Sequence, residues 1–171
     1  MQQPHPRRVA FVIAGWLLTG VAALLAGCAD PSRVAVGTPA AEVLHSVGAP
    51  TGRYPLPDGG ERLQYSSQPG GQTVVNVDVN ANGQVARVEQ ALNEGVFGER
   101  IQTNVWTRAD VLREYGAPAQ IIRVHNFVGD IWVWRYIYGT TWRLLYISID
   151  PSGVVRDWSS GDQNMPDRDR R

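Results

Sequence analysis

The sequence predicts an α+β fold of two tandem units, each a short helix or helix pair packed on a three- to four-stranded antiparallel sheet. A segment with apolar residues at helical spacing and the ending Gly-Ala-Pro occurs twice, at residues 42–50 and 110–118. Runs of alternating apolar residues follow each copy, and those at 75–79 and 145–149 both lead into a glycine-containing turn. Self-similarity at a fixed period, here roughly seventy residues, indicates a duplicated structural unit.

Each unit is expected to open with a short helix. In the first unit, Thr38 is the expected N-cap, and Gly48 followed by Pro50 ends the helix. In the second, Thr107 and Asp110 have the spacing of a capping box, with Asp in place of the usual Glu. Apolar residues at helical spacing mark the faces toward the two cores: Val43, Leu44, Val47, Val111, Leu112 and Tyr115.

After each helix the period of the apolar residues changes from 3.6 to 2, which is typical of strands with one buried face. The strands expected in the first unit are residues 62–66, 73–79 and 84–89. Those expected in the second unit are residues 120–126, 131–138, 142–149 and 154–159. The segment 93–102 joins the units and is expected to add a helical turn.

The pair Gly139-Thr140 predicts a two-residue hairpin loop, so that Trp134 pairs with Leu145 and Trp132 with Ile147 on one face. We expect helices to cover that face. The opposite face then carries the candidate partner-binding residues Val133, Arg135, Ile137, Trp142, Leu144 and Tyr146. A contiguous apolar sheet face is unusual unless something covers it.

Two interpretations of this outer face stay open. It is a docking surface for a protein partner, or it is a second small core covered by the first unit, by the segment between the units or by Trp158. The corresponding outer face of the first unit is predicted to be polar, since it carries Gln64, Asn76 and Asp78.

Ahead of the units, Arg7 and Arg8 precede an apolar run that ends in Leu-Ala-Gly-Cys at Cys28, the only cysteine. This order resembles the lipobox of bacterial lipoproteins. The resemblance implies that residues 1–27 are a signal peptide and that Cys28 carries covalent lipid, the only cofactor-like group we expect. Ala29 follows the cysteine in place of the Asp that retains many lipoproteins in the inner membrane. The implied location is therefore the outer membrane, lipid-anchored and facing the periplasm.

Two other interpretations of this segment remain. It is an uncleaved transmembrane anchor, because the apolar run is about long enough to span a bilayer, or an ordinary signal peptide with a chance cysteine. Residues 28–36 are expected to form a tether between the membrane and the first unit, and 161–171 a disordered tail.

Composition points away from several classes of function. All 16 basic residues are Arg and balance 16 acidic residues, which gives no basic footprint for nucleic acid. The sequence shows no Cys and His spacing typical of zinc and no framed nucleophile, so we expect no metal site, no small-molecule substrate and no enzyme activity.

The motif Gly37-Thr38, Glu42-Val43, Gly48-Ala49-Pro50 and Trp134-Arg135-Tyr136 resembles the SmpA/OmlA (BamE-like) domain family of outer-membrane lipoproteins. Tandem copies also resemble the architecture of β-lactamase inhibitor proteins. The resemblance places one unit at residues 37–92 and another at 93–160. It implies a non-catalytic role in outer-membrane protein assembly or envelope integrity, with a membrane-proximal partner such as the barrel-assembly machinery. The alternative it implies is a periplasmic binding inhibitor of an enzyme such as a hydrolase.

Overall fold

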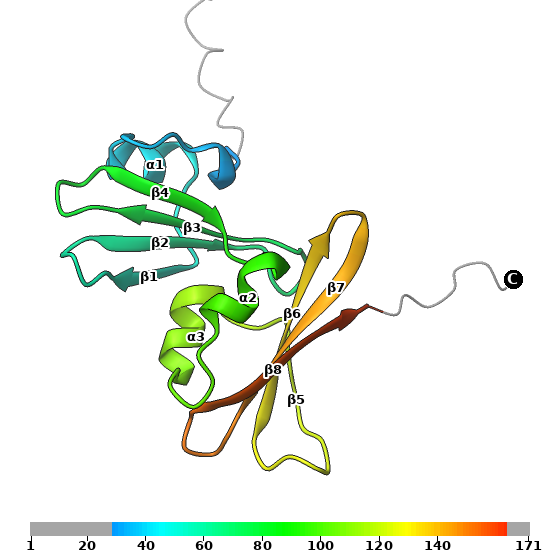
Figure 1. Cartoon of the computed structure of the whole chain (residues 1–171). Coiled ribbons are helices and arrows are strands. Elements are labelled where there is room, and N and C mark those ends of the chain that lie inside the picture. Colours follow the sequence, from blue (N-terminus) through cyan, green and yellow to red (C-terminus); the bar gives the residue numbers. More distant parts are fainter. Residues whose placement is uncertain (1–28, 164–171) are drawn as a thin grey trace, which may run out of the picture.

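The computed structural model describes residues 29–163, and within that range it contains three α-helices and two four-stranded antiparallel sheets (Figure 1). Both sheets are simple meanders, with strand orders β1-β2-β3-β4 and β5-β6-β7-β8. The predicted α+β fold of two tandem units is confirmed. The expected signal peptide at residues 1–27, Cys28 and residues 164–171 of the expected tail lie outside the described residues.

The first half contains the 3-10 helix η1 and one α-helix. Its elements are η1 (Pro31–Arg33), α1 (Ala40–Ser46), β1 (Gly52–Pro55), β2 (Glu61–Ser66), β3 (Val74–Val79) and β4 (Val85–Gln90). Strand β1 was not expected, because four residues that end in proline are too short to display an alternating pattern. The N-cap of α1 is Pro39, so the prediction of Thr38 is wrong by one residue. The Thr38 carbonyl accepts the Val85 amide, which holds Thr38 beside β4 and outside the helix.

The second half repeats this order with one more helix. Its elements are α2 (Glu94–Arg100), α3 (Arg108–Tyr115), β5 (Gln120–Ile122), β6 (Asp130–Tyr138), β7 (Thr141–Ile149) and β8 (Val155–Asp162). Strand β5 is shorter than the predicted 120–126, because the chain turns away from β6 after Ile122. Strand β8 is longer than predicted and includes Gly161 and Asp162, two residues that we had expected in the tail.

The repeat extends to irregularities of the backbone. Both sheets shift register at the end of the third strand, between Asp78 and Val79 in one and between Ser148 and Ile149 in the other. Isolated bridges match as well: Pro39 with Gln84, and Thr107 with Val154. These coincidences in hydrogen bonding support a duplicated unit more strongly than the sequence motif alone.

One substitution within the repeat shows that geometry is kept while the residue type changes. Gly37 donates its amide to the carbonyl of Val85, and Asn104 makes the same bond to Val155. Both have positive φ, 90° for Gly37 and 63° for Asn104. Asn tolerates the left-handed conformation better than other residues with a side chain, so it can stand where the first unit has glycine.

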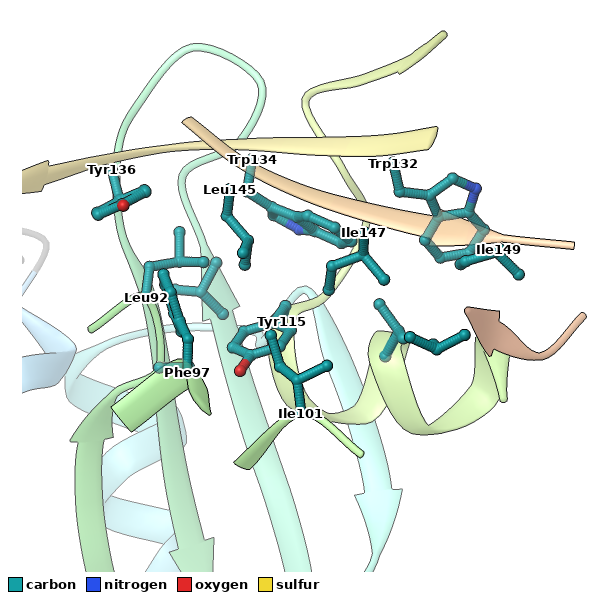
Figure 2. Packing of buried hydrophobic residues seen from close by; sticks show 14 residues of the cluster. Leu92, Phe97, Ile101, Tyr115, Trp132, Trp134, Tyr136, Leu145, Ile147 and Ile149 are labelled. Carbon is teal, nitrogen blue, oxygen red and sulfur yellow. The ribbon is translucent and has the colours of Figure 1, made fainter. Parts of the chain in front are cut away.

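Each half has its own apolar core on one face of its sheet. In the first, Val43 of α1 packs among Leu63, Val75 and Val77 of the strands. In the second, α2 and α3 cover a larger aromatic core, and Figure 2 shows Phe97 and Tyr115 facing the strand residues. The strand side chains of that core are Trp132, Trp134, Tyr136, Leu145, Ile147, Ile149 and Val155 of the second sheet, with Val74 from the first sheet. The helix-covered face predicted for the second sheet is confirmed.

The expected tether is largely folded. Asp30 caps η1 by accepting the Ser32 amide at 2.9 Å, and Val34 packs against the first core. The Ala29 amide reaches the Ser46 carbonyl at the end of α1, at 3.4 Å. Described residues 29–36 therefore pack against the first unit, although we had expected this segment to be a tether.

Candidate functional site

The predicted outer face of the second sheet has the register that the hairpin loop implied. Tyr138 lies opposite Thr141 across the turn, and the cross-strand pairs of the face follow from it. These pairs are Val133 with Tyr146, Arg135 with Leu144, and Ile137 with Trp142. All six candidate residues therefore lie together on the face opposite the helices.

Exposure increases along this face toward the hairpin tip. Val133 is buried, whereas Arg135, Leu144 and Tyr146 are half-buried. At the tip, Ile137 is 47% exposed and Trp142 is 38% exposed. The outermost pair thus presents a branched aliphatic and an indole side chain to solvent.

The first unit touches this face at the edge of β6. Strand β5 pairs with β6 at residues 131–133, so the edge of β6 is open beyond that point. There the Gln68 side-chain amide donates to the Arg135 carbonyl at 2.7 Å and accepts the Arg135 amide at 3.4 Å. The Arg135 guanidinium in turn donates to the Pro69 carbonyl at 3.3 Å. The loop between β2 and β3 therefore closes part of the edge and holds Arg135 in place.

Trp158 was one of the groups expected to cover the outer face if that face were a second core. It lies on the opposite side of the sheet, where its ring meets Phe97 at a centroid distance of 6.0 Å. The interpretation that Trp158 covers the outer face is therefore wrong, because the register places Trp158 opposite Ile147 on the helix-covered side. A Cβ built on Gly161 would lie 3.8 Å from the Tyr146 ring, so Tyr146 lies against the backbone of β8.

The polar face of the first sheet is the main correction to the sequence analysis. Gln64 and Asn76 are buried beneath the C-terminal end of α3, although we expected an outer face. The Gln64 amide donates to the carbonyls of Leu112 and Arg113, at 3.3 and 3.1 Å, and Asn76 donates to Glu114 at 2.9 Å. The last carbonyls of a helix lack intrahelical partners, so the two amides satisfy acceptors that burial would otherwise leave unpaired.

Charged side chains continue this contact. Arg62 pairs with Asp78 of its own sheet and with Glu114 of α3, both at 2.7 Å. Arg100 of α2 bridges Glu114 and Glu89, both at 2.6 Å. Burial acts to lower the pKa of the Arg62 guanidinium, but its bonds to the two carboxylates outweigh burial and raise it, so the cation is permanent. We call these side chains, together with Gln64 and Asn76, the inter-sheet network.

Sequence reasoning missed the inter-sheet network because alternating polar residues in a strand usually indicate a solvated face. The residue types of these strands are the signal that could have predicted the inter-sheet network. Arg62, Gln64 and Asn76 are all donors at alternating or paired positions, and a helix end supplies unpaired acceptors.

A second polar cluster surrounds Glu94, the first residue of α2. Its carboxylate accepts from the Tyr136 hydroxyl at 2.7 Å, from Arg143 at 2.7 and 3.0 Å, and from Ser160 at 3.0 Å. Burial acts to raise the pKa of Glu94, but these bonds outweigh it and hold the pKa below its ordinary value. Burial together with Glu94 raises the pKa of Tyr136 to about 12. The cluster fixes the start of α2 over the second sheet.

Two observations concern groups that bind ions or membranes. Residues 29–163 bring together no group of three or more His, Cys, Asp or Glu side chains suited to a metal ion. Within the same range, no helix combines the length and apolar character that crossing a bilayer requires.

Comparison with known proteins adds one distant similarity. Neither a scan of protein-family models nor a search of curated proteins found a match. Among solved structures, the chain is similar to YjgB, a DUF4309 family protein from Bacillus subtilis, at 11% identity and a TM-score of 0.29. The alignment covers 72% of this chain and 77% of that one.

Proposed function

We propose that this protein is a lipoprotein of the outer membrane, acylated at Cys28 and facing the periplasm, that acts by binding another protein. It takes no cofactor and carries out no reaction in this proposal. Its role is in outer-membrane protein assembly or envelope integrity, as the SmpA/OmlA resemblance implies. The partner is an envelope protein close to the membrane.

The exposed pair Ile137 and Trp142 is the observation that carries the proposal. The two side chains lie side by side at the tip of the outer face and continue into the half-buried Leu144. Trp and Arg are enriched among the residues that dominate binding energy at protein interfaces. With Arg135 as the charged residue within this face, the fitting partner surface is apolar with a carboxylate nearby.

The inter-sheet network supports the same proposal through rigidity. It joins the end of α3 to the first sheet by several short bonds, and Gln68 holds the edge of β6. A binding face held in one orientation loses less conformational entropy on association than a mobile one.

An affinity purification from detergent-solubilised envelopes tests the proposal. The variants Ile137→Arg and Trp142→Arg place charge on the outer face without removing a fully buried side chain. Both should fold and lose the partner, whereas Val128→Arg, at an exposed valine of the β5–β6 loop, should retain it. If the face variants keep the partner, the outer face is not the binding surface.

The identity of the captured protein separates the alternatives. Recovery of subunits of the barrel-assembly machinery supports the assembly role. A periplasmic hydrolase recovered alone supports the binding inhibitor. Intact mass of the purified protein tests the anchor independently, since Cys28→Ala should lose the mass of the acyl groups.

A further inference from the structure

Because segment 29–36 is folded onto the first unit, the proposed anchor Cys28 is joined to the folded protein by a single peptide bond. Consecutive Cα atoms lie about 3.8 Å apart, so Cys28 is one short step from Ala29. Ala29 itself lies beside the end of α1, with its amide on the Ser46 carbonyl. An acylated Cys28 would therefore leave almost no slack between the lipid and the folded protein.

Most residues of this segment are exposed, Asp30 among them, and two of the exposed side chains have the character that a lipid surface suits. Arg33 ends η1 with 86% of its side chain exposed, and its one ion pair among residues 29–163 is a long one, 3.7 Å to Asp30. Val36 is 69% exposed. An arginine guanidinium matches phosphate oxygens in geometry, and a small apolar side chain fits among headgroups.

The arrangement of the elements shows which part of the molecule lies farthest from segment 29–36. In Figure 1 the described chain starts beside α1, at one end of the molecule, and the loop between β5 and β6 lies at the other end. That loop includes Val128, which is 79% exposed. The segment that contains Val36 and the loop that contains Val128 thus lie at opposite ends.

We propose that the surface formed by residues 29–36 beside α1 lies against the membrane, with Arg33 at the lipid phosphates, and that the β5–β6 loop points away from it. This inference rests on the proposed acylation of Cys28. It adds an orientation: the first unit lies at the bilayer surface, and the second unit extends toward the periplasm.

Fluorescence quenching in vesicles tests the orientation. The full-length lipidated protein is reconstituted into phosphatidylethanolamine and phosphatidylglycerol vesicles that contain a lipid with a nitroxide on its headgroup. Single variants Val36→Cys and Val128→Cys carry a thiol-reactive fluorophore; an acylated Cys28 cannot react with it. The label at position 36 should lose its intensity, and the label at 128 should keep it. Equal quenching at both positions, or quenching at 128 alone, overturns the inference.

Two further measurements make the result specific. A flexible Gly-Ser insertion of about ten residues between Cys28 and Ala29 adds a root-mean-square reach of about 16–19 Å and should reduce quenching at position 36. Arg33→Glu should reduce it too, because a carboxylate is repelled by the anionic headgroups. Quenching unchanged by both would overturn the inference. A protein whose intact mass shows no acyl groups overturns the proposed function itself, which is a different result from an acylated protein with an unquenched position 36.

Discussion

Replacing Arg62 by alanine should destabilise the protein by about 3 kcal/mol, near the lower end of the range for breaking a buried ion pair. The Arg62 side chain is 7% exposed, and its partners Asp78 and Glu114 are 14% and 13% exposed. Glu114 keeps Arg100 at 2.6 Å after the change. Asp78 is bound by Arg62 alone within the described residues, so one nearly buried carboxylate loses its partner.

Arg53→Ala is the matched control. Arg53 lies on the neighbouring strand β1 and pairs with Glu61 at 3.3 Å, but both side chains are well exposed. An exposed pair of this kind contributes about 0–1 kcal/mol. The two variants therefore remove the same chemical group from adjacent strands and differ in burial.

Equilibrium urea unfolding followed by Trp fluorescence measures both free energies. A loss of less than about 1 kcal/mol for Arg62→Ala, equal to that of Arg53→Ala, would refute the reasoning, because it would place the inter-sheet network in the same class as a surface pair. Arg62→Lys should give an intermediate loss, since an ammonium keeps the charge but cannot bind Asp78 through two nitrogens at once.

Two further predictions concern titration and burial. Glu94→Gln should flatten the pH dependence of stability in acid: the pKa of Glu94 is lowered on folding, so its stabilisation is present above the unfolded value of about 4.3 and is lost as pH falls through the folded value. Urea midpoints between about pH 6 and pH 3 measure this, and a variant that loses as much stability as the parent would contradict it. Tyr115→Phe should leave stability unchanged or raise it by about 1 kcal/mol, because the Tyr115 hydroxyl is buried without a hydrogen-bond partner within residues 29–163. A thermal melt that shows clear destabilisation would mean that the hydroxyl is satisfied.

The sequence was sufficient for features that depend on local spacing. The hairpin pair Gly139-Thr140 gave the register of β6 and β7, and with it the division of the second sheet into a helix-covered face and an outer face. The capping arrangement at α3 is present too, with Asp110 accepting the Thr107 amide at 2.8 Å. Turn chemistry and alternation act over a few residues, so a single sequence displays them.

Contacts between the units could not be predicted in the same way. The donors Gln64 and Asn76 are separated from the α3 carbonyls by 38 to 49 residues, and alternating polar side chains look the same whether water or a helix end satisfies them. Strand β1 escaped prediction because of its length. Residues 29–36 are held by contacts that show no periodic pattern in eight residues: Val34 reaches the first core, and the Ala29 amide reaches the Ser46 carbonyl.

The polar underside of the first sheet has a consequence for how the chain is made. A polypeptide that emerges amino terminus first exposes its first unit before the second exists. The face that α3 later covers carries Arg62, Gln64, Asn76 and Asp78. Water can solvate these side chains until α3 has been synthesised. An exposed apolar face of the same area would be prone to aggregation at that stage. When α3 forms, Gln64 and Asn76 exchange their water contacts for its carbonyls and Arg62 gains the Glu114 carboxylate, so the two halves can join after the second one has been made.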